Sequence, residues 1–143
     1  MPETIAIASD HAGFDLKQFL IGELKPLGYD ALDLGTHDRN SVDYPDYADV
    51  LAAALADGRA KRGILVCGTG IGIAIAANRH RHIRAATCHD ATSARLTRLH
   101  NDANVLALGA RLIGTEVARD CLAAFVTTAF EGGRHQRRVA KMS

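Results

Sequence analysis

The sequence predicts an α/β fold, a doubly wound parallel sheet with helices on both faces. Short, continuously apolar runs alternate with amphipathic helical stretches from one end of the chain to the other. Strand and helix patterns that alternate about five times in this way favour a parallel sheet. The chain has 143 residues and no visible linker or low-complexity segment, so we expect a single domain spanning residues 1–143.

Five apolar runs are strand candidates, at residues 4–8, 31–34, 64–67, 83–88 and 104–108, of which 31–34 is the weakest. Their hydrophobicity is continuous rather than alternating, which is typical of parallel strands covered on both faces. Three helical stripes lie between or after them, formed by Leu16, Phe19, Leu20, Leu24 and Leu27, by Val50, Leu51, Ala54 and Leu55, and by Val117, Cys121, Leu122, Phe125 and Ala129. The basic tail at 131–143 has no obvious place in the core.

Composition excludes several classes of protein. Seventeen Lys and Arg balance sixteen Asp and Glu, so the basic excess of a general nucleic-acid binder is missing. No apolar run approaches the roughly 20 residues of a membrane span, and the first residues lack the apolar segment of a signal peptide. Three widely spaced cysteines argue against a disulfide framework or a structural zinc site. We expect a cytoplasmic protein that needs no metal and no cofactor.

Chemically rich residues follow the first and third strand candidates. In a doubly wound sheet, ligands bind beyond the carboxyl ends of the strands at the topological switch point. If the strand order is flavodoxin-like, that point lies between strands 1 and 3. The residues there are 9–13, Ser-Asp-His-Ala-Gly, and 67–72, Cys-Gly-Thr-Gly-Ile-Gly. This agreement between topology and residue type is the first functional signal.

The glycine-rich segment after the third strand can direct several backbone N–H groups towards one anion. A dinucleotide fingerprint is the competing interpretation, but its third glycine position is occupied by Ile73, and the turn follows strand 3 rather than strand 1. A purely structural tight turn is the other alternative. Cys67 precedes this segment, where a thiolate is favoured and can act as a base or nucleophile. Cys88 and Cys121 are better explained as small buried hydrophobes.

Four further residues each have a functional and a structural explanation. Asp10 follows strand 1 and is either a helix N-cap or a binding residue across the crevice from Cys67. His100 sits near a helix end, where interaction with the helix dipole is the commoner explanation. Arg134 and Arg138 lie four residues apart, so a helical tail would place two guanidinium groups on one face, suited to a phosphate. A frayed, solvated end is the alternative. The remaining histidines with unmatched spacing, His37, His80, His82 and His89, are read as incidental.

These motifs together resemble the type B ribose-5-phosphate isomerases and the related galactose 6-phosphate isomerase subunits. The matching segments are SDHAG at 9–13, DYP at 43–45, CGTGIGI at 67–73, LHNDANVLALGAR at 99–111 and EGGRHQRR at 131–138. The resemblance implies a Rossmann-like sheet of five parallel strands. It also implies an aldose–ketose isomerase that forms a homodimer or a dimer of dimers with shared active sites and uses no metal.

The same resemblance implies roles for individual residues. Cys67 is similar to the proton acceptor and His100 to the ring-opening acid, with Asp10 assisting, and Thr69 is counted among the catalytic residues. The cradle of the developing oxyanion corresponds to Gly68, Thr69, Gly70, Ile71 and Gly72. Sugar contacts correspond to Asp10, His11 and Asn101, phosphate contacts correspond to Arg111, Arg134 and Arg138, and Tyr44 is expected to line the substrate pocket. The substrate implied is ribose 5-phosphate, in exchange with ribulose 5-phosphate.

Rival functions remain open at this point. They are isomerisation of another aldose phosphate such as galactose 6-phosphate or allose 6-phosphate, a nucleotide-binding regulatory module, and a cysteine hydrolase built on Cys67 and His100. Geometry adds one expectation. A crossover helix runs antiparallel to the strands, so His100 should lie near the opposite edge of the sheet, some 17–20 Å from Cys67 at about 3.3 Å per strand residue. The two would then meet only between neighbouring subunits.

Overall fold

A computed structural model describes all residues, 1–143, and contains one five-stranded sheet and six helices. The strands are β1 (Glu3–Ser9), β2 (Tyr29–Asp33), β3 (Arg62–Cys67), β4 (Ala85–Thr87) and β5 (Val105–Gly109). The helices are α1 (Phe14–Leu24), α2 (Tyr44–Ala56), α3 (Ile71–Ala77), α4 (Ala91–Asn101), α5 (Thr115–Thr127) and α6 (Arg134–Met142). None of the six helices combines the length and apolar character needed to cross a bilayer.

Every strand pair in the sheet is parallel, and the strand order is β2-β1-β3-β5-β4. The predicted α/β class and the adjacency of β1 and β3 are confirmed. A flavodoxin-like order is wrong for the last two strands, because β5 pairs with β3 and β4 lies at the edge. Burial explains why β4 and β5 exchange positions relative to that order. All five residues of β5 are buried, whereas the three residues of β4 are half-buried. A strand that is buried throughout suits the centre of a sheet.

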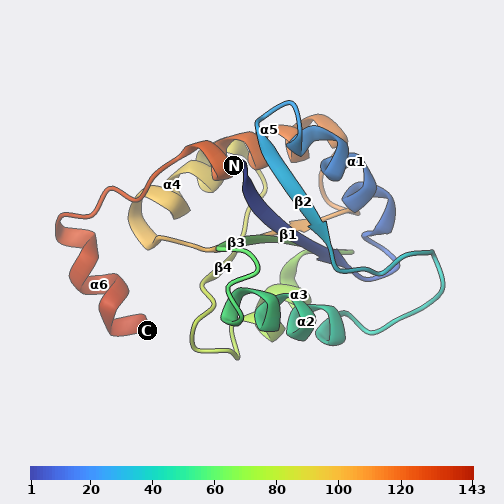
Figure 1. Cartoon of the computed structure of the whole chain (residues 1–143), viewed down its shortest axis with the longest axis horizontal. Helices are drawn as coiled ribbons and strands as arrows, with labels where there is room; N and C mark the ends of the chain where they lie inside the picture. The colour runs from blue at the N-terminus through green and yellow to red at the C-terminus, as the bar shows by residue number, and fades with distance from the viewer.

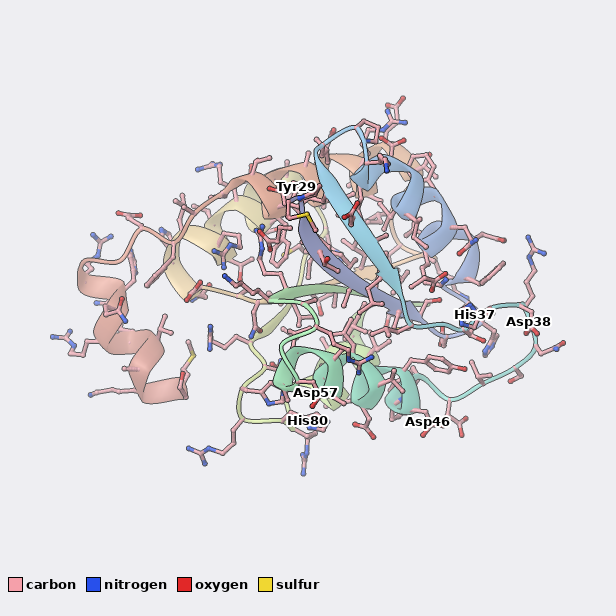
Figure 2. The ribbon with its side chains drawn as sticks, viewed as in Figure 1. Tyr29, His37, Asp38, Asp46, Asp57 and His80 are labelled. Carbon is pink, nitrogen blue, oxygen red and sulfur yellow. The ribbon has the colours of Figure 1, made fainter.

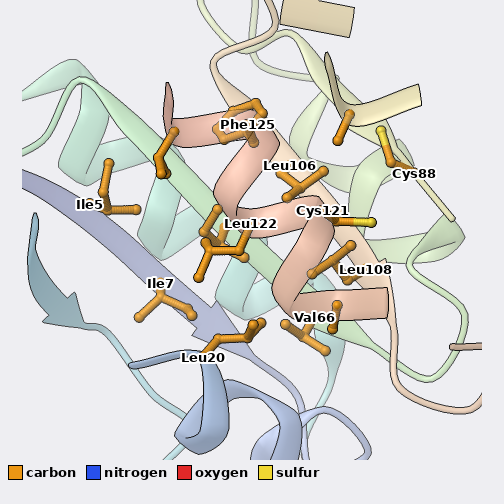
Figure 3. Close-up of a cluster of buried hydrophobic side chains, with 14 of the residues drawn as sticks. Ile5, Ile7, Leu20, Val66, Cys88, Leu106, Leu108, Cys121, Leu122 and Phe125 are labelled. Carbon is orange, nitrogen blue, oxygen red and sulfur yellow. The ribbon is translucent and has the colours of Figure 1, made fainter. Parts of the chain in front are cut away.

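Helices cover both faces of the sheet (Figure 1). On one face, α1, α4 and α5 pack on alternate residues of the strands, and Figure 3 shows part of this apolar cluster around Leu106, Leu122 and Phe125. On the other face, α2 and α3 pack on the intervening strand residues, among them Leu65 and Ala107. Because successive strand residues point to opposite faces, both clusters draw on the same strands.

The helical stripes were predicted well in their middles and less well at their ends. Leu27 follows α1 and Ala129 follows α5, so neither is helical. Val50 and Val117 are within helices but more than a third exposed. The expectation that the tail has no place in the core needs a correction. The tail forms α6, which stands apart from the sheet beside α4 (Figure 1). Two residues of this helix, His135 and Val139, are buried. The residues 131–143 therefore do contribute to a buried contact.

Candidate active site

Cys67 ends β3 at the carboxyl edge of the sheet and is 4% exposed. The chain then turns through Gly68 and Thr69 to Gly70, whose φ of 75° places it in the left-handed region that favours glycine. This turn brings the Gly70 N–H to the sulfur, to which it donates a hydrogen bond of 3.1 Å. A donor on the sulfur stabilises negative charge there, so the local structure suits a thiolate.

The rest of the glycine-rich loop is fixed by bonds to neighbouring elements. The Gly68 carbonyl accepts from the Arg111 N–H, the Gly70 carbonyl accepts from the Thr87 hydroxyl, and the Thr69 hydroxyl accepts from the Ile71 N–H. The Arg111 side chain also packs beside Gly68: a methyl group on Gly68 would lie 3.4 Å from its Cδ. Arg111 is thus brought to the same edge as Cys67, as expected for a residue just after β5.

Asp10 and His11 follow β1, which neighbours β3. Asp10 is 6% exposed, and its Oδ1 accepts a hydrogen bond of 3.0 Å from the Gly13 N–H. It is not the N-cap of α1, because Gly13 holds that position without a side-chain cap. The Val42 N–H donates to Nδ1 of His11 at 3.1 Å, so in the neutral ring the proton is carried by Nε2. Both side chains are held in place by the backbone.

Tyr44 covers the far side of the loop. It is the first residue of α2, and its ring packs against the backbone of Gly72: a methyl group there would approach the ring carbons to 2.8 Å. The structure therefore brings together at one edge of the sheet the following predicted site residues: Asp10, His11, Tyr44, Cys67, Gly68, Thr69, Gly70, Ile71, Gly72 and Arg111.

The other predicted site residues form a second group, which lies near the amino ends of the strands, opposite to the end that carries Cys67. His100 and Asn101 end α4, and the backbone that follows leads directly into the start of β5. Cys67 is aligned with Gly109, and Gly63 with Val105 at the amino end of β5. Four residues of strand correspond to about 13 Å. The expectation that His100 lies beyond the end of the strands away from Cys67 agrees with this topology, and the strand alone accounts for this part of the separation.

Arg134 and Arg138 belong to this second group. They lie four residues apart in α6, and both side chains are exposed. The tail is attached to α4 by a hydrogen bond from the Glu131 N–H to the Leu99 carbonyl. Beside it, a cavity of about 410 Å³ lies between α4, β4 and the end of α6, and Asn101 is part of its wall. None of the three cavities of the chain is lined by Cys67 or Asp10.

Sequence reasoning missed His135, which lies in the first turn of α6. Its ring stacks on that of His100 with centroids 4.5 Å apart, and it is 6% exposed. Burial, followed by the positive charge of Arg134 and the proximity of His100, lowers its pKa. The available signal was the position of His135 between two arginines assigned to phosphate binding. Two histidines read as incidental, His37 after β2 and His80 after α3, lie at the surface beside carboxylates, Asp33 and Asp49 respectively (Figure 2 labels both histidines).

The other cysteines differ from Cys67 in their surroundings. Cys88 directly follows β4, and Cys121 lies on the buried side of α5. Burial raises the pKa of the Cys88 thiol, and it raises that of Cys121 to about 12. Neither sulfur accepts a backbone N–H bond of the kind found at Cys67. Their interpretation as small buried hydrophobes agrees with these surroundings.

Comparison with known proteins covers almost the entire chain. Residues 5–142 match the model of the ribose/galactose isomerase family. Ribose-5-phosphate isomerase B of Escherichia coli is 47% identical over 135 residues, which are 94% of this chain and 91% of that protein. D-erythrulose-4-phosphate isomerase of Pectobacterium atrosepticum is 45% identical over 141 residues, covering 97% and 92% of the two chains.

Comparison with solved structures agrees with the sequence comparison. The crystal structure of a ribose 5-phosphate isomerase from Thermotoga maritima superposes with a TM-score of 0.95 at 50% identity, covering 98% of this chain and 97% of that one. The similarity therefore includes the loop at Cys67, the end of α4 and the tail. This chain belongs to the ribose/galactose isomerase family and is a sugar-phosphate isomerase.

Proposed function

We propose that the chain interconverts ribose 5-phosphate and ribulose 5-phosphate by proton transfer through an enediolate. The observation that carries the proposal is the hydrogen bond from the Gly70 N–H to Cys67 Sγ, which provides a stabilised sulfur base at the switch point between β1 and β3. The carbonyl moves from C1 to C2 when a base removes the C2 proton and returns it to C1, while the O2 hydroxyl loses its proton and O1 gains one. Cys67 is the base in this proposal.

The enediolate oxygens need fixed donors as negative charge develops on them. The loop after Cys67 supplies backbone N–H groups, and its carbonyls are already bonded to β4 and to the segment after β5, so the loop is rigid before substrate binds. The Ile71 N–H is bonded to the Thr69 hydroxyl and the Gly70 N–H to Cys67 Sγ, which leaves the Gly68, Thr69 and Gly72 amides as the proposed donors. Asp10 and His11 contact the sugar from the neighbouring strand end.

Ring opening requires an acid, which we assign to His100 of a second subunit. Within one chain, His100 and Cys67 lie at opposite edges of the sheet, and no cavity of the chain encloses the thiol. Exposed apolar side chains lie next to the thiol loop: Ile71 is 50% and Ile75 is 60% exposed on α3. A two-fold contact that covers this surface would build two complete sites at once. We therefore propose a homodimer, or a dimer of dimers, with shared sites.

The phosphate is assigned to Arg134 and Arg138 on the subunit that donates His100, with Arg111 on the subunit that donates Cys67. Exposed guanidinium groups four residues apart on α6 suit a dianion. Remote binding energy from the phosphate then holds the reacting carbons against the thiol.

Activity should be measured with ribose 5-phosphate, galactose 6-phosphate, allose 6-phosphate and erythrulose 4-phosphate on the purified protein. We expect the highest kcat/KM with ribose 5-phosphate. A higher value with one of the other sugars would change the substrate assignment but keep the reaction, whereas no turnover of any of them would refute the isomerase. The last substrate is included because a relative 45% identical to this chain carries its name.

Sharing of the site is tested by subunit exchange between two inactive variants, Cys67→Ala and His100→Ala. Each mixed dimer would contain one doubly damaged site and one intact site, so activity should reappear on mixing. Self-mixed samples of each variant are the controls, and exchange is confirmed by native mass spectrometry. Complete exchange without recovered activity would show that both residues act within one chain and would refute the shared site.

A further inference from the structure

Three potential metal ligands meet where α4 and α6 join the connecting loop. His100 ends α4, Glu131 lies in the loop, and His135 is in the first turn of α6. One ligand atom from each lies within 4.8 Å of the others. The hydrogen bond from the Glu131 N–H to the Leu99 carbonyl holds the loop against α4, so the three residues are brought together by the fold although 35 positions separate the histidines.

His135 supplies an independent observation. The residue is only 6% exposed, and its Nε2 is fully buried without a hydrogen-bond partner, one of only two such side-chain atoms in the chain. A buried polar nitrogen without a partner is costly, and in native structures it usually reflects a ligand, ion or water. Without an ion, a water molecule or the Glu131 carboxylate could form the missing hydrogen bond to the ring. The side chains that surround the ring, however, carry the ligand atoms of a metal site.

We propose that His100, Glu131 and His135 form a binding site for a divalent transition metal ion, with Zn²⁺ as the best match. Two imidazoles and one carboxylate, with the fourth position left to water, are a donor set of open zinc sites. Tetrahedral zinc with bonds of about 2.0–2.2 Å separates its ligand atoms by about 3.3–3.5 Å. Closing from 4.8 Å requires movements of about 1.5 Å. The exposed side chain of Glu131 can make such a movement, and the half-buried His100 ring must also turn out of its stack with His135, because the nitrogen lone pairs of two stacked rings do not converge on one ion.

Binding of the ion has a consequence that rests on the proposed function. A nitrogen of His100 that coordinates a metal cannot donate a proton to a sugar ring. The ion is therefore an inhibitor and has no part in the isomerisation. Glu131 has no assigned catalytic role, so its replacement should remove the inhibition and preserve turnover.

The binding site is tested without reference to turnover, by titrating the full-length protein with Co²⁺ and recording its visible spectrum. The variants are Glu131→Gln and His135→Asn. A matched control is His80→Asn, because His80 is a surface histidine paired with one carboxylate, Asp49, at 2.8 Å (Figure 2). Each ligand variant should weaken Co²⁺ binding at least about tenfold, since changes even in outer partners cost 10- to 100-fold. The control should bind as the wild type does.

A sulfur-to-cobalt charge-transfer band that disappears in Cys67→Ala, together with unchanged Co²⁺ affinity in both ligand variants, would assign the ion to the thiol and overturn the proposal. Absence of saturable binding, or equal affinity in wild type and Glu131→Gln, would also overturn it. Glu131→Gln changes an exposed residue, so the test stands even if His135→Asn does not fold.

Inhibition is measured with ribose 5-phosphate and increasing Zn²⁺. Glu131→Gln should retain wild-type turnover without the ion and require at least about ten times more Zn²⁺ for half inhibition. Saturable Co²⁺ binding by a protein that turns over no sugar phosphate would refute the proposed function and leave the metal site standing. Turnover that is insensitive to Zn²⁺ while Co²⁺ binds would refute the inhibitory role.

Discussion

Replacement of Gly70 by alanine tests whether the backbone turn after Cys67 supports both stability and turnover. Gly58, in the turn after α2, is a matched control, because its φ of 78° is nearly that of Gly70 at 75°. A methyl group on Gly58 would meet nothing within 4 Å. On Gly70 it would lie 2.8 Å from the carbonyl carbon of Leu108 and 3.0 Å from the nitrogen of Gly109, both backbone atoms of β5.

The expected destabilisation follows from these two environments. The left-handed conformation costs an alanine about 1–2 kcal/mol, which should be the whole effect at Gly58. At Gly70 the collision with β5 adds about 1–3 kcal/mol, because backbone cannot move aside as a flexible side chain does. At about 3 °C per kcal/mol for a chain of this size, Tm should fall by roughly 3–6 °C in Gly58→Ala and 6–15 °C in Gly70→Ala.

Turnover separates the variants further. A shift of the Gly70 backbone withdraws the N–H that donates to Cys67 Sγ at 3.1 Å and misaligns the adjacent amides. Loss of one aligned donor typically lowers kcat about 10²- to 10³-fold, whereas Gly58→Ala should retain wild-type kcat. The assays are thermal unfolding at one protein concentration and ribose 5-phosphate kinetics well below both Tm values. Equal Tm and equal kcat in the two variants would refute the reasoning.

Three further predictions concern side chains. Cys67→Ala should nearly abolish exchange of the substrate C2 proton with solvent, measured by NMR, and near-normal exchange would exclude Cys67 as the base. Iodoacetamide below pH 9 should modify neither Cys88 nor Cys121 in the folded protein, because burial raises both pKa values, that of Cys121 to about 12, and disfavours the thiolates. Peptide mapping checks this, and labelling of either before unfolding would contradict it. Arg134→Ala should weaken binding of a phosphorylated sugar analogue about 10- to 150-fold by calorimetry, corresponding to 1.5–3 kcal/mol, with Arg137→Ala as the unaffected control.

The strands and the first group of site residues were predictable because their signals are local. The run 64–67 is apolar throughout and ends in Cys67, and the glycine-rich segment follows at once, so the carboxyl end of the strand and the chemistry were read from adjacent residues. The order of β4 and β5 was not predictable in this way. Both are short apolar runs, and the choice of edge depends on how each is covered by helices distant in sequence.

The cluster at His100 shows a different limit. Glu131 and His135 are four residues apart, which a sequence pattern can register, but His100 joins them only through the packing of the tail against α4. The tail itself was underestimated because its apolar content is low. It buries only His135 and Val139, and it does so against α4 rather than in either main apolar cluster.

The position of α6 has a consequence for the evolution of specificity. Because α6 packs beside α4 and contributes to neither main apolar cluster, its displacement by an ångström or two would leave the sheet and the loop at Cys67 intact (Figure 1). In the proposed assembly, α6 carries the arginines that bind the phosphate, and β3 carries the base. The distance between them therefore determines the length of the sugar carbon chain that fits the site. Relatives at 45–47% identity are named for four-carbon and five-carbon sugar phosphates. Selection on the contact between α4 and α6 could thus change the length of the sugar while conserving the proton-transfer chemistry.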